Sequence, residues 1–375
     1  MKCAMQVDDN STGKKGCANI VELFFNLIRC GMGKCDCLSR VPGDVEWGEL
    51  FEIAKKQTLL GIAFAGIERL PQEQRPPKDI LLQWYKMCML IKKSNADLNR
   101  KCAAVSEKFR SEGFENCILK GQGLAQLYPD PTLRTPGDID VWLDGGDKKA
   151  IGYVRRFFPE CKPTYHHVDF PIVPDLEIEI HYRPSWAYSP FANKRLQRFF
   201  SSVANEQFGN YVNTPEGAFP VPDLAFNRVY VLLHIYRHLF FEGIGMRQIL
   251  DYYYVLQQEM DDAEKRAFIA DLRRFKLMKF AGALVYVMQQ MFGLEQKLTF
   301  IRPNRKLGKF VLKEVMVAGN FGKYDHRYSL GEHEYSFKRG VEMMRRNMTL
   351  ITRFPGEILW SPYFKIWHFF WRKRH

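Results

Sequence analysis

Two acidic side chains at alternate positions are the clearest sign of chemistry in this sequence. They are Asp138 and Asp140, in the run GDID at residues 137–140. Successive side chains of a β-strand point to opposite faces, so a strand here places both carboxylates on one face. Two like charges this close are stabilised by a divalent cation, and hard cations prefer carboxylate oxygens. The pair is therefore predicted to hold a metal ion.

A later run of alternating residues can supply a third carboxylate. In LEIEIH, residues 176–181, the acidic side chains Glu177 and Glu179 share one face with His181. Nucleotidyl and phosphoryl transfer commonly use two metal ions held by a carboxylate cluster. This run is thus the best candidate for completing such a cluster.

A turn upstream of the aspartates is suited to phosphate. Residues 117–119 are predicted to form a short buried strand that stops at Lys120 and Gly121, and residues 121–128 to form a helix ended by Pro129. Free N–H groups at a helix start, the positive end of its dipole and an ammonium group favour phosphate. Gly137, before the aspartates, lets a ligand approach the backbone closely.

Together these motifs resemble the polymerase-beta-type nucleotidyltransferase superfamily, and within it a poorly characterised bacterial family with the layout LKG…R..GDID…E.H. The resemblance extends over about residues 17–375. It implies an α+β fold, with a nucleotidyltransferase core of a small mixed sheet and helices flanked by N- and C-terminal helical regions. There are two departures: Gln122 stands where the superfamily usually has Gly or Ser, and the gap between Gly121 and Asp138 is longer than is typical.

The resemblance also implies roles for particular residues. Asp138, Asp140 and Glu179 would be both the catalytic residues and the ligands of Mg²⁺, with Mn²⁺ as the alternative metal. The nucleotide would come from an NTP, and the acceptor is not identified by the sequence. The residues predicted to bind the nucleotide are Lys120, Gly121, Gln122, Arg134, Gly137, His181, His238, Arg247 and Asp251.

Several of these residues have a second interpretation. Arg134 could pair with an acidic side chain instead of a phosphate. Arg247 and Asp251 are four residues apart on a predicted helix and could form an intrahelical ion pair. His238 and His234 have the spacing of a zinc-binding HxxxH, but no third ligand stands at metalloprotease spacing, so zinc is disfavoured there.

Two more histidines are expected near the site. Residues 166–173 and 175–183 are strand-like runs joined by Pro174, and they are predicted to pair antiparallel. That pairing brings His166 and His167 towards His181. The alternative for each of the three is a hydrogen-bonded structural imidazole.

Length and composition bound the rest. The chain has 375 residues, is 46% hydrophobic and carries a formal net charge of +13. It has no apolar run of the ~18 residues that a membrane span needs and no apolar segment typical of a secretory signal. The predicted organisation is a disordered tail at 1–16, a helical region at 17–113, the core at 114–215 and a helical domain at 216–375. A cytoplasmic location is expected.

The cysteines agree with a reducing compartment. Nine is an odd number, and Cys88, Cys102 and Cys117 stand among apolar neighbours, which predicts buried free thiols. The cluster at residues 30, 35 and 37 lacks paired CxxC spacing, so a solvent-side loop is favoured over a zinc site.

Other functions remain open. The protein could be a catalytically silent nucleotide-binding or regulatory protein. It could bind nucleic acid, although residues 337–375 hold nine Lys and Arg against two Glu, so much of the excess charge is local. The aromatic and basic tail at 360–375 could also contact an anionic membrane surface, although packing on the domain is favoured.

Overall fold

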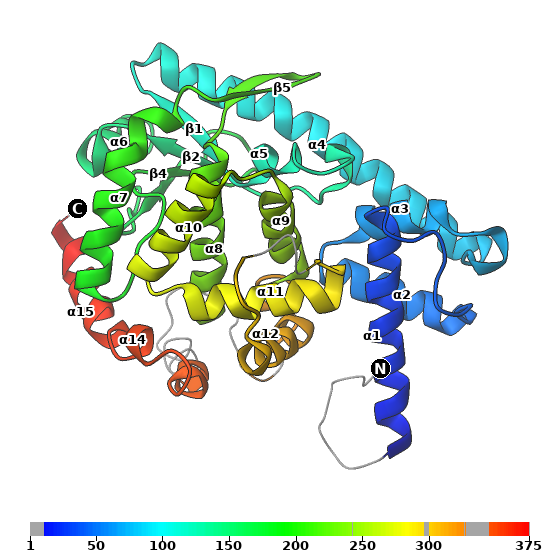
Figure 1. The fold of residues 1–375 in the computed structure, drawn as a ribbon. Coiled ribbons are helices and arrows are strands. Elements are labelled where there is room, and N and C mark those ends of the chain that lie inside the picture. The colour runs from blue at the N-terminus through cyan, green and yellow to red at the C-terminus, as the bar shows by residue number, and fades with distance from the viewer. Residues whose placement is uncertain (1–10, 242, 296–299, 326, 328–344, 375) are drawn as a thin grey trace.

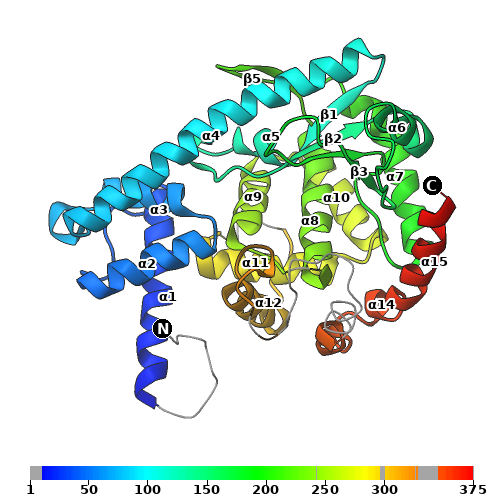
Figure 2. The ribbon, with the colours of Figure 1, turned by 180° about the vertical axis from the view of Figure 1, so that it is seen from behind.

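The computed structural model describes residues 11–241, 243–295, 300–325, 327 and 345–374 (Figure 1). It is a mixed α+β structure in which helices surround a small four-stranded mixed sheet, as the sequence predicts, and a two-stranded hairpin is separate from that sheet. The long helix α4 (Lys78–Ser111) runs along one side of the molecule, and most of the later helices lie on the opposite side of the sheet (Figures 1 and 2).

The sheet has four strands in the order β1-β2-β4-β3. They are β1 (Asn116–Leu119), β2 (Ile139–Leu143), β3 (His167–Asp169) and β4 (Ile178–His181). β2 is antiparallel to β1 and parallel to β4, and β3 is antiparallel to β4. The predicted strand at 117–119 is confirmed, and so is the antiparallel pairing of the two runs that flank Pro174. The strand predicted at the aspartate pair begins at Ile139, so Asp140 lies in it and Asp138 immediately precedes it.

The two faces of β2 are buried against different parts of the molecule. Ile139, Val141 and Leu143 belong to a hydrophobic core that also includes apolar residues of α4 and α6 (Gly146–Arg155). On the other face Trp142 stacks on Phe226, with 5.5 Å between the ring centroids. The alternation predicted from the sequence therefore separates two cores and leaves Asp140 on the Trp142 side.

Within the described residues, three α-helices precede α4. They are α1 (Ser11–Gly31), α2 (Asp44–Lys56) and α3 (Leu60–Arg69). Helix α1 begins inside the segment 1–16 that the sequence predicts to be disordered, and residues 1–10 lie outside the described residues. The backbones of α1 and α3 are in close contact at Gly66. A Cβ at this position would lie inside the contact distance of the Leu27 carbonyl oxygen, so only glycine fits without a shift.

After the sheet, α7 (Pro190–Gln207) leads into a hairpin of β5 (Tyr211–Thr214) and β6 (Gly217–Pro220). The predicted boundary between residues 215 and 216 falls inside this hairpin. Helix α8 (Leu224–Phe241) follows, and the Asp223 side chain accepts a hydrogen bond from the Phe226 N–H at 2.7 Å. Asp223 therefore caps the helix.

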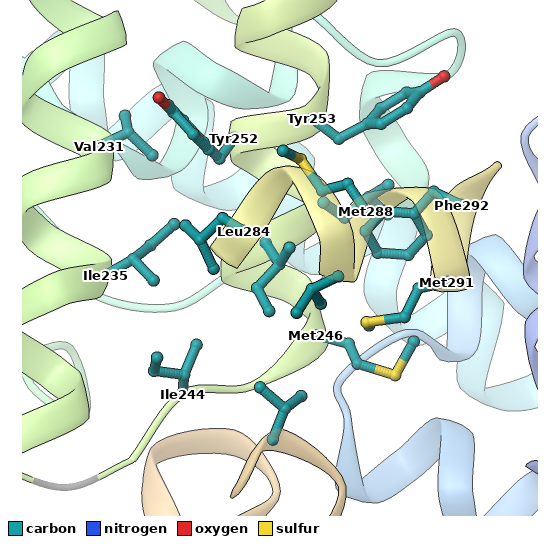
Figure 3. Packing of buried hydrophobic residues seen from close by; sticks show 14 of the residues in the cluster. Val231, Ile235, Ile244, Met246, Tyr252, Tyr253, Leu284, Met288, Met291 and Phe292 are labelled. Carbon is teal, nitrogen blue, oxygen red and sulfur yellow. The ribbon is translucent and has the colours of Figure 1, made fainter. Parts of the chain in front are cut away.

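The remaining helices build the larger core. They are α9 (Met246–Gln257), α10 (Asp262–Arg274), α11 (Met278–Phe292), α12 (Arg305–Ala318), α14 (Pro355–Ile358) and α15 (Ser361–Arg374). Figure 3 shows side chains of α8, α9 and α11 meeting in this core, among them Ile235, Met246, Leu284 and Met288. This packing holds α8 and α9 together, and both contribute to the site described below.

The C-terminal helix α15 packs on the domain through one face. Phe364 stacks on Trp186 with ring centroids 4.0 Å apart, and Trp371 meets Tyr165 edge to face. Ile366 and Phe370 are exposed. Contact of this tail with a membrane surface stays a prediction. Among the described residues, no helix combines the length and apolar character needed to cross a bilayer.

The free thiols predicted at Cys88, Cys102 and Cys117 are confirmed, and all three are buried. Cys30 is also buried, at the end of α1, whereas Cys37 is exposed in the loop that follows.

Candidate active site

The register between β2 and β4 places Asp140 directly opposite Glu179. His181, two residues along β4, bridges them: its Nε2 lies 2.7 Å from Asp140 Oδ1 and 3.0 Å from Glu179 Oε2. The three side chains each offer a ligand atom within 4.8 Å of the others, a spacing that suits a metal ion. Two carboxylates distant in the sequence thus converge, with a histidine as the third member of the group.

Lys120 approaches the same cluster from the end of β1. The pairing of β1 with β2 sets Leu119 opposite Asp140, so the next residue is carried to the aspartate. The Lys120 Nζ lies 2.8 Å from Asp140 Oδ2. Its backbone φ of 53° is uncommon for a residue with a Cβ, and such backbone strain clusters at functional sites.

The helix after Lys120 is shorter than predicted. It is α5 (Gly121–Ala125), followed by a turn and a short 3₁₀ segment at Pro131–Leu133. The Tyr128 side chain, which lies beyond the end of the helix, donates a hydrogen bond to Asp251. A helix of this length contributes little dipole, so Lys120 itself carries most of the positive charge at this turn.

The carboxylates differ in their electrostatic surroundings. Burial raises the pKa of Asp140, but the Lys120 ammonium and the His181 hydrogen bond outweigh it and hold that pKa below its usual value. Burial likewise opposes the ionisation of Glu179, and His167 with His181 brings its pKa well below the usual range. Burial lowers the pKa of His181, but its two carboxylate partners raise it to about 9. The imidazole therefore carries a proton at neutral pH in this arrangement.

Asp138 lies apart from that ion-paired group. Its pKa is raised, first by burial and then by the neighbouring Asp140 charge, and Lys120 offsets only part of this. In the part of the chain that the structure describes, Asp138 belongs to none of the groups with metal-ligand spacing. It lines an adjoining pocket instead.

This pocket has a volume of about 440 Å³, including the open space at its mouth. Most of the residues that the sequence predicts to bind a nucleotide meet in its wall. Sequence reasoning missed the apolar and polar residues that α8 and α9 add. The lining consists of Lys120, Gly121, Leu124, Arg134, Gly137, Asp138, Val231, His234, Ile235, Arg247, Gln248 and Asp251.

Two arginines tie the loop before β2 to α9. Arg134 makes a bidentate pair with Asp251, with Nε to Oδ1 at 2.7 Å and Nη2 to Oδ2 at 2.9 Å. Arg247 Nη1 donates to the carbonyl oxygens of Thr135 and Pro136. The alternative in which Arg134 pairs with an acidic side chain is therefore realised here, with Asp251 as its partner.

Three predicted nucleotide-binding residues lie outside the pocket wall: His181, which belongs to the carboxylate cluster described above, Gln122 and His238. The Gln122 side chain is buried against α4, where its Nε2 donates to Asn99 Oδ1 at 2.6 Å. His238 lies one turn beyond His234 on α8, and the two rings are 4.3 Å apart. Spacing of three and four residues puts Val231, His234 and Ile235 on one face of α8. This periodicity could have identified His234, in place of His238, as the histidine that lines the pocket.

Comparison with known proteins identifies the family of this chain. The model of a family described as "Uncharacterised nucleotidyltransferase" matches residues 43–293. A comparison with curated proteins found no match. Among solved structures, the chain matches an antigenic nucleotidyltransferase-like protein from Paracoccidioides brasiliensis at 14% identity and a TM-score of 0.28, covering 52% of this chain and 91% of that one.

The family match spans the sheet, the Lys120 turn, both carboxylate strands and the α8–α9 wall of the pocket. The chain belongs to this family of uncharacterised nucleotidyltransferases.

Proposed function

We propose that this protein transfers a nucleoside monophosphate from an NTP to an acceptor hydroxyl or phosphate, releasing pyrophosphate. The observation that carries the proposal is the contact of the Lys120 ammonium with Asp140, with Glu179 opposite Asp140 and with Asp138 in the wall of the pocket that Lys120 also lines. An ammonium group that can bind phosphates lies beside carboxylates that can bind a metal ion, and nucleotidyl transfer needs both.

The donor chemistry fits a divalent cation. Asp140 is buried and ionised, and both of its oxygens already contact cationic side chains. Asp138, Asp140 and Glu179 would hold Mg²⁺, or Mn²⁺ as the alternative. The bound ion would neutralise triphosphate charge and make the acceptor oxygen more nucleophilic.

The chain's own residues then have separate tasks. Lys120 and the backbone at Gly121 bind the phosphates, so that the α-phosphorus faces the carboxylates. The acceptor oxygen bonds to that phosphorus while the bond from it to the bridging oxygen breaks, and pyrophosphate leaves. Asp138, in the pocket wall, accepts the acceptor's proton. The Arg134–Asp251 pair and Arg247 hold the loop that carries Gly137 in place.

Pyrophosphate release tests the proposal. Each of the four NTPs is incubated with Mg²⁺, with water or a small-molecule cell extract as the acceptor. We expect release with at least one NTP, lowered by about 100-fold or more in Asp138→Asn, the size of effect seen when a transition-state contact is removed. Asp97→Asn is the matched control, because Asp97 is an exposed ion-pair partner on α4.

Binding separates the alternatives. A non-hydrolysable α,β-methylene NTP analogue is titrated with Mg²⁺ by calorimetry. Analogue binding without release in any mixture would favour a catalytically silent nucleotide-binding protein. If the protein neither binds the analogue nor releases pyrophosphate, the proposal is overturned.

A further inference from the structure

Three histidines meet where β3 pairs with β4. His167 stands directly opposite His181 in the register, and His166 immediately precedes β3. The ring centroids are 4.3 Å apart for His166 and His167, 5.5 Å for His166 and His181, and 5.4 Å for His167 and His181. One nitrogen from each ring lies within 4.8 Å of the other two.

These separations match a shared metal ion. Imidazole nitrogens sit ~2.1 Å from a tetrahedral Zn²⁺, which places the ring centroids roughly 5 Å apart. The strand pairing already holds the rings at about this spacing, so little rearrangement is required.

Each ring also has one nitrogen close to an oxygen of the protein. His166 Nδ1 forms a hydrogen bond with Thr164 Oγ1 at 3.3 Å, and His167 Nδ1 lies 2.9 Å from Glu179 Oε2 without hydrogen-bond geometry. His181 uses Nε2 for Asp140 and Glu179. Histidines that bind metals typically use their second nitrogen in this way, because the outer hydrogen bond sets the tautomer and the ring orientation.

The remaining nitrogen of His181, Nδ1, is a second indication that a ligand binds here. The His181 side chain is 4% exposed, and its Nδ1 has no hydrogen-bond partner among the described residues. A buried polar atom without a partner costs about 1–3 kcal/mol, so it is uncommon unless a ligand satisfies it.

We propose that His166, His167 and His181 form a binding site for a transition-metal ion, Zn²⁺ being the best fit, beside the carboxylates of the proposed active site. Imidazole suits Zn²⁺ and its neighbours, whereas Mg²⁺ prefers oxygen ligands. Asp169, whose carboxylate is near His167 and Glu179, or water completes the coordination. A neutral imidazole binds the metal through its unprotonated nitrogen, and a ring that is protonated at both nitrogens releases one proton to solvent.

This site is distinct from the proposed Mg²⁺ site but is coupled to it. Glu179 and Asp140 contact His167 and His181 and so act as outer partners of the three-histidine site. A metal on the three rings would therefore orient the carboxylates that the transfer reaction needs. The inference rests on the proposed function only for this consequence, and not for binding itself.

Cobalt substitution tests the site. The full chain is freed of metal and titrated with Co²⁺, whose visible absorption distinguishes four-coordinate from six-coordinate sites. We expect one tightly bound Co²⁺ with a four-coordinate spectrum, displaced by Zn²⁺ and retained in excess Mg²⁺. His166→Ala and His166→Gln should each weaken binding by about tenfold or more.

His238→Ala is the matched control, because His234 and His238 are also adjacent but lack a third ligand among the described residues. Binding unchanged in the His166 variants, loss only in His238→Ala, or displacement by Mg²⁺ would each overturn the proposal. Should both His166 variants fail to fold by circular dichroism, X-ray absorption of the Zn²⁺-loaded wild type decides. Three imidazoles around the metal support the site, and an all-oxygen shell rejects it.

Asp138→Asn separates the two proposals. It should keep Co²⁺ binding and lose Mg²⁺-dependent pyrophosphate release. Absence of Co²⁺ binding together with release that depends on Asp138 would reject the three-histidine site alone. If Co²⁺ binds but neither the wild type nor the variant releases pyrophosphate, the transferase proposal alone is rejected.

Discussion

The Nζ of Lys120 lies 2.8 Å from Oδ2 of Asp140, and both side chains are largely buried. The ammonium group thereby offsets the cost of burying the carboxylate, and Lys120 also lines the pocket. A positive charge held this way can move to a phosphate when a divalent cation takes its place beside Asp140. The pair thus links the stability of the protein with its proposed chemistry.

Lys120→Met should weaken the binding of an α,β-methylene NTP analogue. A hydrogen bond to a charged group contributes about 1.5–3 kcal/mol, so the loss in affinity should be about 10- to 100-fold. Calorimetry with Mg²⁺ measures it. Lys92→Met is the control, because Lys92 pairs with Asp130 where both are exposed. Equal affinity of the two variants would exclude Lys120 from phosphate binding.

Arg134→Met should destabilise the protein strongly. Arg134 and Asp251 are 5% and 6% exposed, and removing one partner leaves the other charge buried with Tyr128 alone. Breaking such a pair costs about 3–5 kcal/mol. Urea unfolding checks this, with Arg100→Met as the control, since the exposed Arg100–Asp97 pair should contribute at most about 1 kcal/mol. A cost for Arg134→Met no larger than the control's would show that the pair is not a main support of the loop.

Gly66→Ala should disrupt the contact between α1 and α3. The added Cβ would meet the Leu27 carbonyl oxygen, which belongs to a helix backbone and cannot move alone. We expect a loss of about 1–3 kcal/mol, as for other overpacked sites. Gly48→Ala is the matched control, because nothing lies within 4 Å of a Cβ there. In α2 that change should be neutral or stabilising by up to about 1 kcal/mol. The same thermal shift for both variants would contradict the close approach.

His368 should make the protein less stable in mild acid. Its pKa is lowered to about 4, chiefly by burial and then by Arg372 and His167. Below the ordinary value of about 6.5 the unfolded chain binds the proton more readily than the folded one, so the free energy of unfolding decreases as the pH falls from about 6.5 to 4.

His368→Phe should remove about 1 kcal/mol of that dependence, a figure reduced for partial exposure, because Phe can occupy the position between Phe364 and Trp371 without titrating. Urea unfolding at pH 7 and pH 5 measures the difference. Tyr363→Phe, an exposed position on the same helix, should leave it unchanged. An identical pH dependence in the wild type and His368→Phe would show that His368 is not the responsible group.

Local features of the site were predictable from the sequence. The alternation in GDIDVWL placed the strand and separated Asp140 from the apolar face of β2. Asp223 marked the start of α8, and the Lys-Gly pair marked the turn after β1. Each of these depends on neighbours within a few residues, since side-chain period and capping are properties of short segments.

The length of α5 was less predictable. The helix pattern continued to Tyr128, but a hydrogen bond from Tyr128 to Asp251, distant in the sequence, accompanies an earlier end. A tertiary contact outweighed local propensity, which is weak for so short a segment.

The sequence by itself determined which residues could do chemistry: two aspartates on one strand face, an acidic strand that ends in histidine, and a lysine before a glycine. Only the tertiary structure decided how they combine. The parallel register of β2 with β4 set Asp140 opposite Glu179. The packing of α9 brought Asp251 into an ion pair with Arg134, and the β3–β4 pairing brought three imidazoles together. Register and helix packing depend on the burial of the whole core, so contacts between residues far apart in the chain cannot be obtained from local periodicity.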